Sequence, residues 1–126
     1  MKITFDCFIK PISKKNKMKF NRQHGRAYKA KEVREFELFL FEWADKQKKL
    51  WEENNREAWP MNKKYFLQVD VVYGTKHKFD IQNVFDTICD AMEGVFYEDD
   101  SQIVAIKGSK AFDAKIDKFT ITLSVL

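Results

Sequence analysis

The sequence contains few of the residues that build the commonest small-protein sites. Among 126 residues there are two cysteines, two histidines and four glycines. Cys7 and Cys89 lack metal-type spacing, and the two histidines have no ligand spacing with them or with each other, so zinc is not expected. No glycine-rich phosphate loop is present. No apolar run approaches the roughly 20 residues that cross a bilayer, and the N-terminus has no signal-peptide pattern.

The bulk composition is that of one folded domain. A chain of 126 residues with 44% hydrophobic residues and twelve phenylalanines is long enough to bury a core. We therefore expect residues 1–126 to form a single domain. We place it in the cytoplasm, where the reducing environment argues against a disulfide. Cys7 is in phase with Ile3 and Phe5 and is expected to point into the core.

The two signs of charge are separated along the chain. The net charge is +4, and residues 10–31 contain nine basic and no acidic side chains. We interpret this basic stretch as a loop whose positive potential suits a phosphate backbone; the alternative is an ordinary solvated loop. Between Lys78 and Lys107, in contrast, every charged side chain is acidic: Asp80, Asp86, Asp90, Glu93, Glu98, Asp99 and Asp100.

Hydrophobic periodicity predicts the remaining elements. Alternation of apolar and polar residues predicts strands, and helical spacing predicts two helices. The order strand, helix, strand, helix, strand, strand indicates an α/β (α+β) fold, with a small mixed sheet of about four strands covered by two main helices. The expected strands are residues 3–9, 65–73, 104–106 and 119–125, and the expected helices are residues 30–51 and 80–94.

The second of these helices has one apolar and one polar face. Asp80 is a suitable N-cap, because its carboxylate can accept the free N–H groups of the first turn. Gly94 is a natural C-terminal stop. On a helical wheel the apolar arc contains Ile81, Val84, Phe85, Ile88, Met92 and Val95. The opposite stripe contains Gln82, Asn83, Asp86, Asp90 and Glu93.

The acidic residues are a candidate metal site. Carboxylates held close together repel one another unless a cation binds among them. Hard cations such as Mg²⁺ take oxygen ligands and often bridge to phosphate, and they assist the attack of water on phosphodiesters. An acidic pocket in a basic protein fits that use. The alternative is the solvated face of an ordinary helix.

Three segments carry a family resemblance: residues 79–84 (FDIQNV), 90–95 (DAMEGV) and 97–103 (YEDDSQI). Together they resemble the core of RusA-type Holliday junction resolvases, and residues 11–16 (PISKKN) and 25–29 (GRAYK) resemble the start of that family. The resemblance implies a small homodimeric, Mg²⁺-dependent endonuclease, often encoded by phages and prophages. Such enzymes cut four-way DNA junctions symmetrically.

Carried over by position, the resemblance assigns roles to particular residues. Asp80 and Asp100 match two of the three metal-binding aspartates of the family, and Asn83 matches its asparagine. Gln82 stands where the family has an aspartate, and Asp86 where it has a catalytic lysine. Residues 82 and 86 are one helical turn apart on one face, so the carboxylate lost at 82 reappears at 86.

These observations lead to one principal hypothesis and two alternatives. The chain is expected to be an endonuclease in which Asp80 and Asp100 bind Mg²⁺, or Mn²⁺ in its place, with help from Gln82, Asp86 or Asp99. The alternatives are a protein that binds branched DNA without cutting it and a protein-interaction domain that docks through the acidic helix. The residues expected to contact DNA are Lys14, Lys15, Arg22, Arg26, Lys76, Lys78 and Asn83.

Overall fold

A computed structural model describes residues 1–9, 18–21, 26–29, 31–74, 81–113 and 115–126. The elements follow in chain order. They are β1 (Lys2–Cys7), β2 (Met18–Asn21), β3 (Arg26–Lys29), α1 (Lys31–Asn55), β4 (Tyr65–Tyr73), α2 (Ile81–Met92), the 3₁₀ turn η2 (Asp100–Gln102), β5 (Ile103–Phe112) and β6 (Lys118–Val125).

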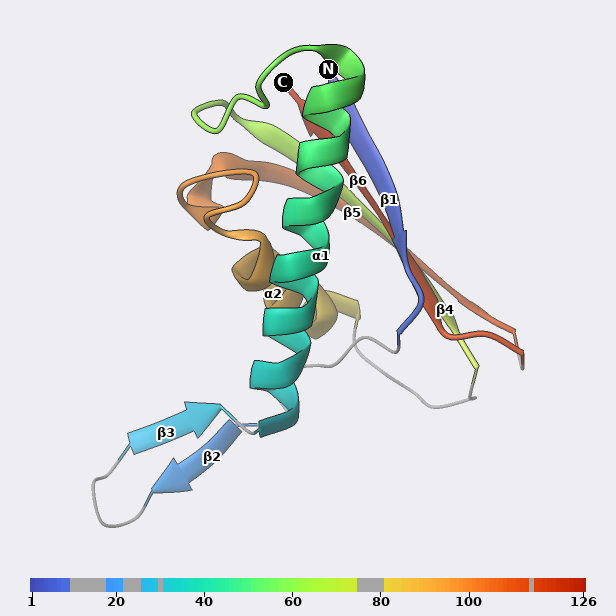
Figure 1. Cartoon of the computed structure of the whole chain (residues 1–126). Coiled ribbons are helices and arrows are strands. Elements are labelled where there is room, and N and C mark those ends of the chain that lie inside the picture. The colour runs from blue at the N-terminus through green and yellow to red at the C-terminus, as the bar shows by residue number, and fades with distance from the viewer. Residues whose placement is uncertain (10–17, 22–25, 30, 75–80, 114) are drawn as a thin grey trace.

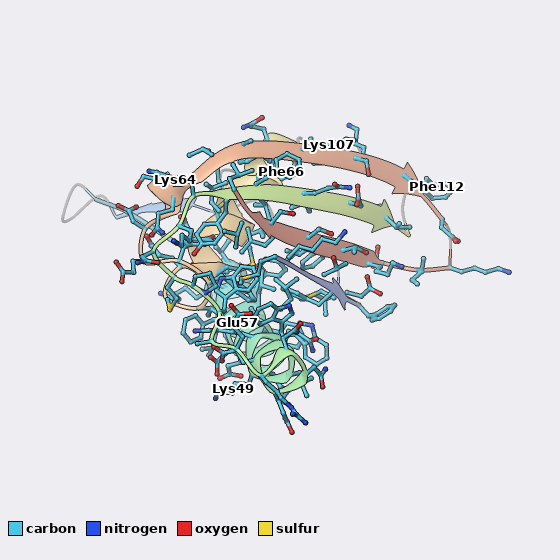
Figure 2. The ribbon with its side chains drawn as sticks, turned by 90° about the horizontal axis from the view of Figure 1, so that it is seen from above. Lys49, Glu57, Lys64, Phe66, Lys107 and Phe112 are labelled. Atoms are coloured by element: carbon cyan, nitrogen blue, oxygen red, sulfur yellow. The ribbon has the colours of Figure 1, made fainter. Side chains whose placement is uncertain are left out.

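Four of the strands form one mixed sheet, in the order β1-β6-β4-β5. β4 runs parallel to β5 and antiparallel to β6, and β6 runs antiparallel to β1. The parallel pair is joined through α2, as a parallel connection requires. α1 and α2 lie on the same side of the sheet, and the other face carries no helix among the residues described (Figures 1 and 2). The predicted fold class is confirmed.

Two of the expected elements are corrected by the structure. The basic stretch is not a loop throughout, because β2 and β3 form an antiparallel hairpin within it. β5 spans ten residues where residues 104–106 were expected. Each strand of the hairpin has only four residues, too few for a clear alternation in the sequence. Among the described strands, β5 pairs only with β4 and forms an edge of the sheet. Most of its residues are exposed, so the sequence shows no apolar alternation there.

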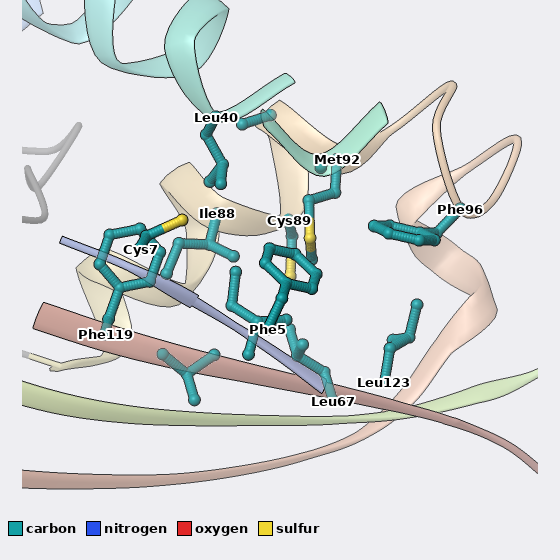
Figure 3. Close-up of a cluster of buried hydrophobic side chains, with 14 of the residues drawn as sticks. Phe5, Cys7, Leu40, Leu67, Ile88, Cys89, Met92, Phe96, Phe119 and Leu123 are labelled. Atoms are coloured by element: carbon teal, nitrogen blue, oxygen red, sulfur yellow. The ribbon is translucent and has the colours of Figure 1, made fainter. Parts of the chain in front are cut away.

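The core lies between the helices and the sheet (Figure 3). β4 alternates strictly between buried and half-buried residues, and α1 contributes the buried side chains of Val33, Phe36, Leu40 and Ala44. Cys7 and Cys89 are both buried free thiols. Burial is the main cause that raises the pKa of each to about 12, so neither is a reactive thiolate at neutral pH.

Two indole groups fix α1 against the outer edge of β1. The Nε1–H of Trp43 donates to the carbonyl oxygen of Asp6 at 2.9 Å. The Nε1–H of Trp51 donates to the carbonyl oxygen of Lys2 at 3.0 Å. These carbonyls point away from β6, so the tryptophans satisfy acceptors that an edge strand otherwise leaves to water.

α2 packs directly against β5 at Gly108. A Cβ atom added at this glycine would lie 2.0 Å from Cζ of Phe85 and 3.0 Å from Cδ1 of Ile81, both on α2. Residue 108 therefore has to lack a side chain for α2 to sit at this height above the sheet. The height of α2 matters because its C-terminal end leads into residues 93–100, an acidic segment that contains Glu93, Glu98, Asp99 and Asp100.

Replacing Gly108 with alanine should destabilise the fold. The added methyl group collides with the Phe85 ring, and we expect a loss of roughly 1–3 kcal/mol in the free energy of unfolding, the usual cost of overpacking a core. Urea denaturation followed by circular dichroism measures this loss. In the double variant Gly108→Ala/Phe85→Leu, the smaller side chain makes room, so the two losses should not add. Additive losses would show that residue 108 does not set the position of α2.

Candidate metal centre

The acidic segment begins directly after α2, where the chain reverses direction. Gly94 has φ +87°, a conformation that favours glycine. Its N–H donates to the carbonyl oxygen of Tyr97 at 2.8 Å, and Glu93 forms an isolated β-bridge with Tyr97. This tight turn brings the end of the helix back toward residue 100, where the N–H of Asp100 donates to Oε1 of Glu93 at 3.2 Å.

Three consecutive buried side chains anchor this turn in the core. Val95, Phe96 and Tyr97 are each at most 1% exposed. The hydroxyl of Tyr97 donates to the carbonyl oxygen of Cys89 at 2.6 Å, and Nε1–H of Trp59 donates to the carbonyl oxygen of Phe96 at 3.0 Å. The acidic residues on either side therefore project from a fixed base.

The 3₁₀ turn η2 fixes the other side of the segment. Asp99 is its N-cap, and Oδ1 of Asp99 accepts the N–H of Ser101 at 3.2 Å. Gln102 completes a capping box by accepting the N–H of Asp99 at 2.9 Å. Asp99 and Asp100 thus sit on backbone whose hydrogen bonds are satisfied.

These two turns bring three carboxylates together. One oxygen from each of Glu93, Asp99 and Asp100 lies within 4.8 Å of the others, and all three residues are exposed. The pKa of Asp100 is raised, first because its protonated form is hydrogen-bonded to Asp99, then by partial burial, and then by the charges of Glu93, Asp99 and Asp90. The pKa of Asp99 is lowered, chiefly by the backbone N–H of Ser101.

The donor set fits a hard divalent cation. Mg²⁺ and Mn²⁺ prefer carboxylate oxygens, and Mg²⁺ usually keeps several waters while a few protein oxygens hold it. Glu93, Asp99 and Asp100 supply such oxygens on the surface, where water and a phosphate can complete the shell. The charges of Glu93, Asp99 and Asp90 add to the raised pKa of Asp100 after the hydrogen bond to Asp99 and burial, and a bound cation would relieve this repulsion.

The site residues predicted from the sequence coincide with this cluster only in part. Asp100 lies in it. Gln82 is exposed in the first turn of α2, and Asp86 is exposed one turn later. Arg26 begins β3 and Asn83 lies in α2. Six predicted residues fall outside the described part of the chain: Lys14, Lys15, Arg22, Lys76, Lys78 and Asp80.

Gln82 and the cluster lie toward opposite ends of α2. Glu93 is eleven residues beyond Gln82, which corresponds to about 16 Å along a helix axis. Asp86 lies nearer to the cluster. Besides burial, the charges of Asp86, Asp100 and Asp90 all raise the pKa of the Cys89 thiol, so the anionic stripe of α2 continues toward Asp100.

Glu93 is the cluster member that the sequence did not assign as a ligand. It was placed on the polar stripe of the helix, but its approach to Asp100 depends on the turn at Gly94. The sequence signal that could have indicated this approach was Gly94 itself. A helix-stopping glycine directly after an acidic residue directs the chain back past that residue.

The fold and this cluster define a class of protein: a small α+β domain of net positive charge with exposed carboxylates gathered at one turn. The chain belongs to the RusA family, because the family model described as endodeoxyribonuclease RusA matches residues 9–124. The family comprises metal-dependent Holliday junction resolvases that act on junction DNA, so the resemblance seen in the sequence is confirmed. A comparison with curated proteins gives no match. In the described part of the chain, no helix is long and apolar enough to span a membrane.

Replacing Asp100 with asparagine should stabilise the metal-free protein at neutral pH and remove its response to metal. A raised folded-state pKa contributes stability only in acid, and this contribution is lost as the pH rises through that pKa. At pH 7 the charged Asp100 is therefore a liability, which asparagine removes. The advantage of the variant should vanish at low pH, where the carboxylates are protonated.

Thermal or urea denaturation with and without Mn²⁺ tests this expectation. At a Mn²⁺ concentration of 100 times its Kd, the wild type should gain about 2.7 kcal/mol in the free energy of unfolding, whereas Asp100→Asn should gain much less. Glu98→Gln is the matched control, since Glu98 is exposed nearby but lies outside the cluster. An equal gain in Asp100→Asn would exclude Asp100 as a ligand.

Proposed function

We propose that this protein is a Mg²⁺-dependent endonuclease that resolves four-way DNA junctions. Membership of the RusA family supports the substrate class. The observation that carries the proposal for this chain is the convergence of Glu93 and Asp99 on Asp100, the residue that the resemblance to the family motif suggests as a metal ligand. Mn²⁺ is expected to replace Mg²⁺, because both take oxygen ligands.

Each part of the chain has a distinct task in this proposal. Asp100 holds the cation together with Glu93 and Asp99. Gln82 and Asp86 on α2 are further candidates, and so is Asp80, which lies outside the described residues. When bound, the cation supplies a Lewis acid that promotes the attack of water on the scissile phosphodiester. The protein fixes the carboxylates before DNA arrives, because the buried residues 95–97 anchor the turn that bears them.

The basic residues have a separate role in binding. Their positive charge attracts the phosphate backbone and offsets the repulsion between the acidic cluster and DNA. Symmetric cutting of a junction needs two equivalent active sites, so we propose a two-fold homodimer as the working form. The residues proposed to contact phosphate or DNA are Lys14, Lys15, Arg22, Arg26, Lys76, Lys78 and Asn83.

Cleavage of a synthetic four-way junction tests the proposed activity. In Mg²⁺ or Mn²⁺ the wild type should produce paired nicks, separated on a denaturing gel. Asp100→Asn should cut at least about 100-fold more slowly, a loss of roughly 2.7 kcal/mol of transition-state stabilisation. Glu98→Gln should cut at nearly the wild-type rate. Undiminished cutting by Asp100→Asn, or no cutting by the wild type, would refute the proposal.

A second candidate function is junction binding without cleavage. It is favoured by one observation: the exposed stripe of α2 carries Gln82 and Asp86 where the family has an aspartate and a lysine. Gln82 offers a neutral oxygen but no charge to attract a cation. Such a protein would bind junctions in a strongly salt-dependent manner and leave them intact.

The variant Gln82→Asp tests whether position 82, about 16 Å along the helix axis from Glu93, takes part in metal binding. If loss of this carboxylate weakens metal binding, the variant should bind Mn²⁺ about 10-fold more tightly, which titration calorimetry measures as a lower Kd. If wild-type cleavage is absent, the variant should also gain nicking activity. An unchanged Kd would show that position 82 does not contribute to the metal site.

A further inference from the structure

Gln102 links the acidic turn to a distant loop through all the hydrogen bonds that its side chain can make. Its Oε1 accepts the N–H groups of Glu98 and Asp99, each at 2.9 Å. Its Nε2 donates to the carbonyl oxygens of Met61 and Lys63, each at 2.8 Å. A carboxamide has two N–H donors and one oxygen with two lone pairs, so its capacity is filled.

The loop at the far end of this link is held in place by aromatic packing. It connects α1 to β4 and contains Trp59, which is 3% exposed. The Trp59 ring stacks on Tyr65 at 6.0 Å and packs edge-on against Trp51 at 5.1 Å. The N–H of Trp59 donates to Glu52 at 2.8 Å, and the Tyr65 hydroxyl donates to the carbonyl oxygen of Pro60.

The geometry points to Gln102 as a positioning residue for the cation site, an inference that rests on the proposed function. Gln102 does not reach the cation with its own oxygen, because that oxygen already accepts two backbone N–H groups. It instead fixes the backbone of residues 98 and 99 relative to the loop at Met61 and Lys63. The carboxylates of Asp99 and Asp100 then face Glu93 without having to be ordered when the metal binds.

This arrangement reduces the cost of metal binding. Carboxylates that repel one another would separate if the turn were free to open, and the cation would have to bring them back together. Four hydrogen bonds from one side chain oppose that separation. Outer partners of this kind typically change metal affinity by 10–100-fold when they are removed. A residue that only stabilised the fold would change the melting temperature without this effect on metal affinity.

Gln102→Met tests the inference, since methionine has a similar length and makes none of the four hydrogen bonds. We expect its Kd for Mn²⁺, measured by electron paramagnetic resonance at a temperature where the protein is folded, to rise 10–100-fold. Gln68→Met is the matched control. Gln68 lies in β4 and donates to Asp70 at 3.0 Å, remote from the acidic turn, so its Kd should stay within about two-fold of the wild type.

A measurement on the wild type keeps the inference testable if Gln102→Met fails to fold. In a Mg²⁺ titration followed by NMR, the side-chain amide signals of Gln102 should shift with the same Kd as the backbone amide of Asp100. Those of Gln68 should not shift. Gln102 signals that stay fixed, or a folded Gln102→Met variant with the wild-type Kd, would overturn the inference alone. A wild type that binds neither cation would overturn the proposed function, and the inference with it.

Discussion

The acidic site depends on the burial of three consecutive side chains, Val95, Phe96 and Tyr97. Burying each of the two aromatic rings contributes roughly 1.5–3 kcal/mol, and the hydroxyl of Tyr97 is satisfied inside the core. This free energy of burial stabilises the turn, although the carboxylates on either side of it repel one another. The hydrophobic core therefore offsets the electrostatic cost of presenting Glu93, Asp99 and Asp100 together, so the carboxylate cluster forms without a ligand.

The same dependence of the acidic segment on core packing explains how β4, α2 and β5 are arranged. Gly108 lets α2 sit low on β5, the turn at Gly94 reverses the chain, and η2 starts the return to the sheet. Gln102 then ties the start of β5 to the loop that precedes β4, the parallel neighbour of β5. Each of these contacts restrains the acidic segment further. Its geometry therefore depends on how α2 packs against the sheet.

Sequence periodicity anticipated the parts of this layer whose burial is regular. β4 and the apolar arc of α2 follow directly from the spacing of residues such as Leu67, Val69 and Ile88, because one face of each element is buried. The length of β5 was underestimated, since the residues of an exposed edge strand need not alternate between apolar and polar. The role of Glu93 was not visible, because its approach to Asp100 arises from a tertiary turn. Asp100 itself was found through its family motif.

The tryptophans of α1 have a consequence for how this sheet can grow. Trp43 and Trp51 occupy carbonyl groups on the free edge of β1, so a further strand cannot pair regularly along that side. In the described part of the chain, β5 is the other edge of the sheet. A sheet that can be extended on one side only can form a closed pair of molecules but not an open-ended stack. The two indole N–H groups thus limit regular strand pairing to the β5 edge of the sheet.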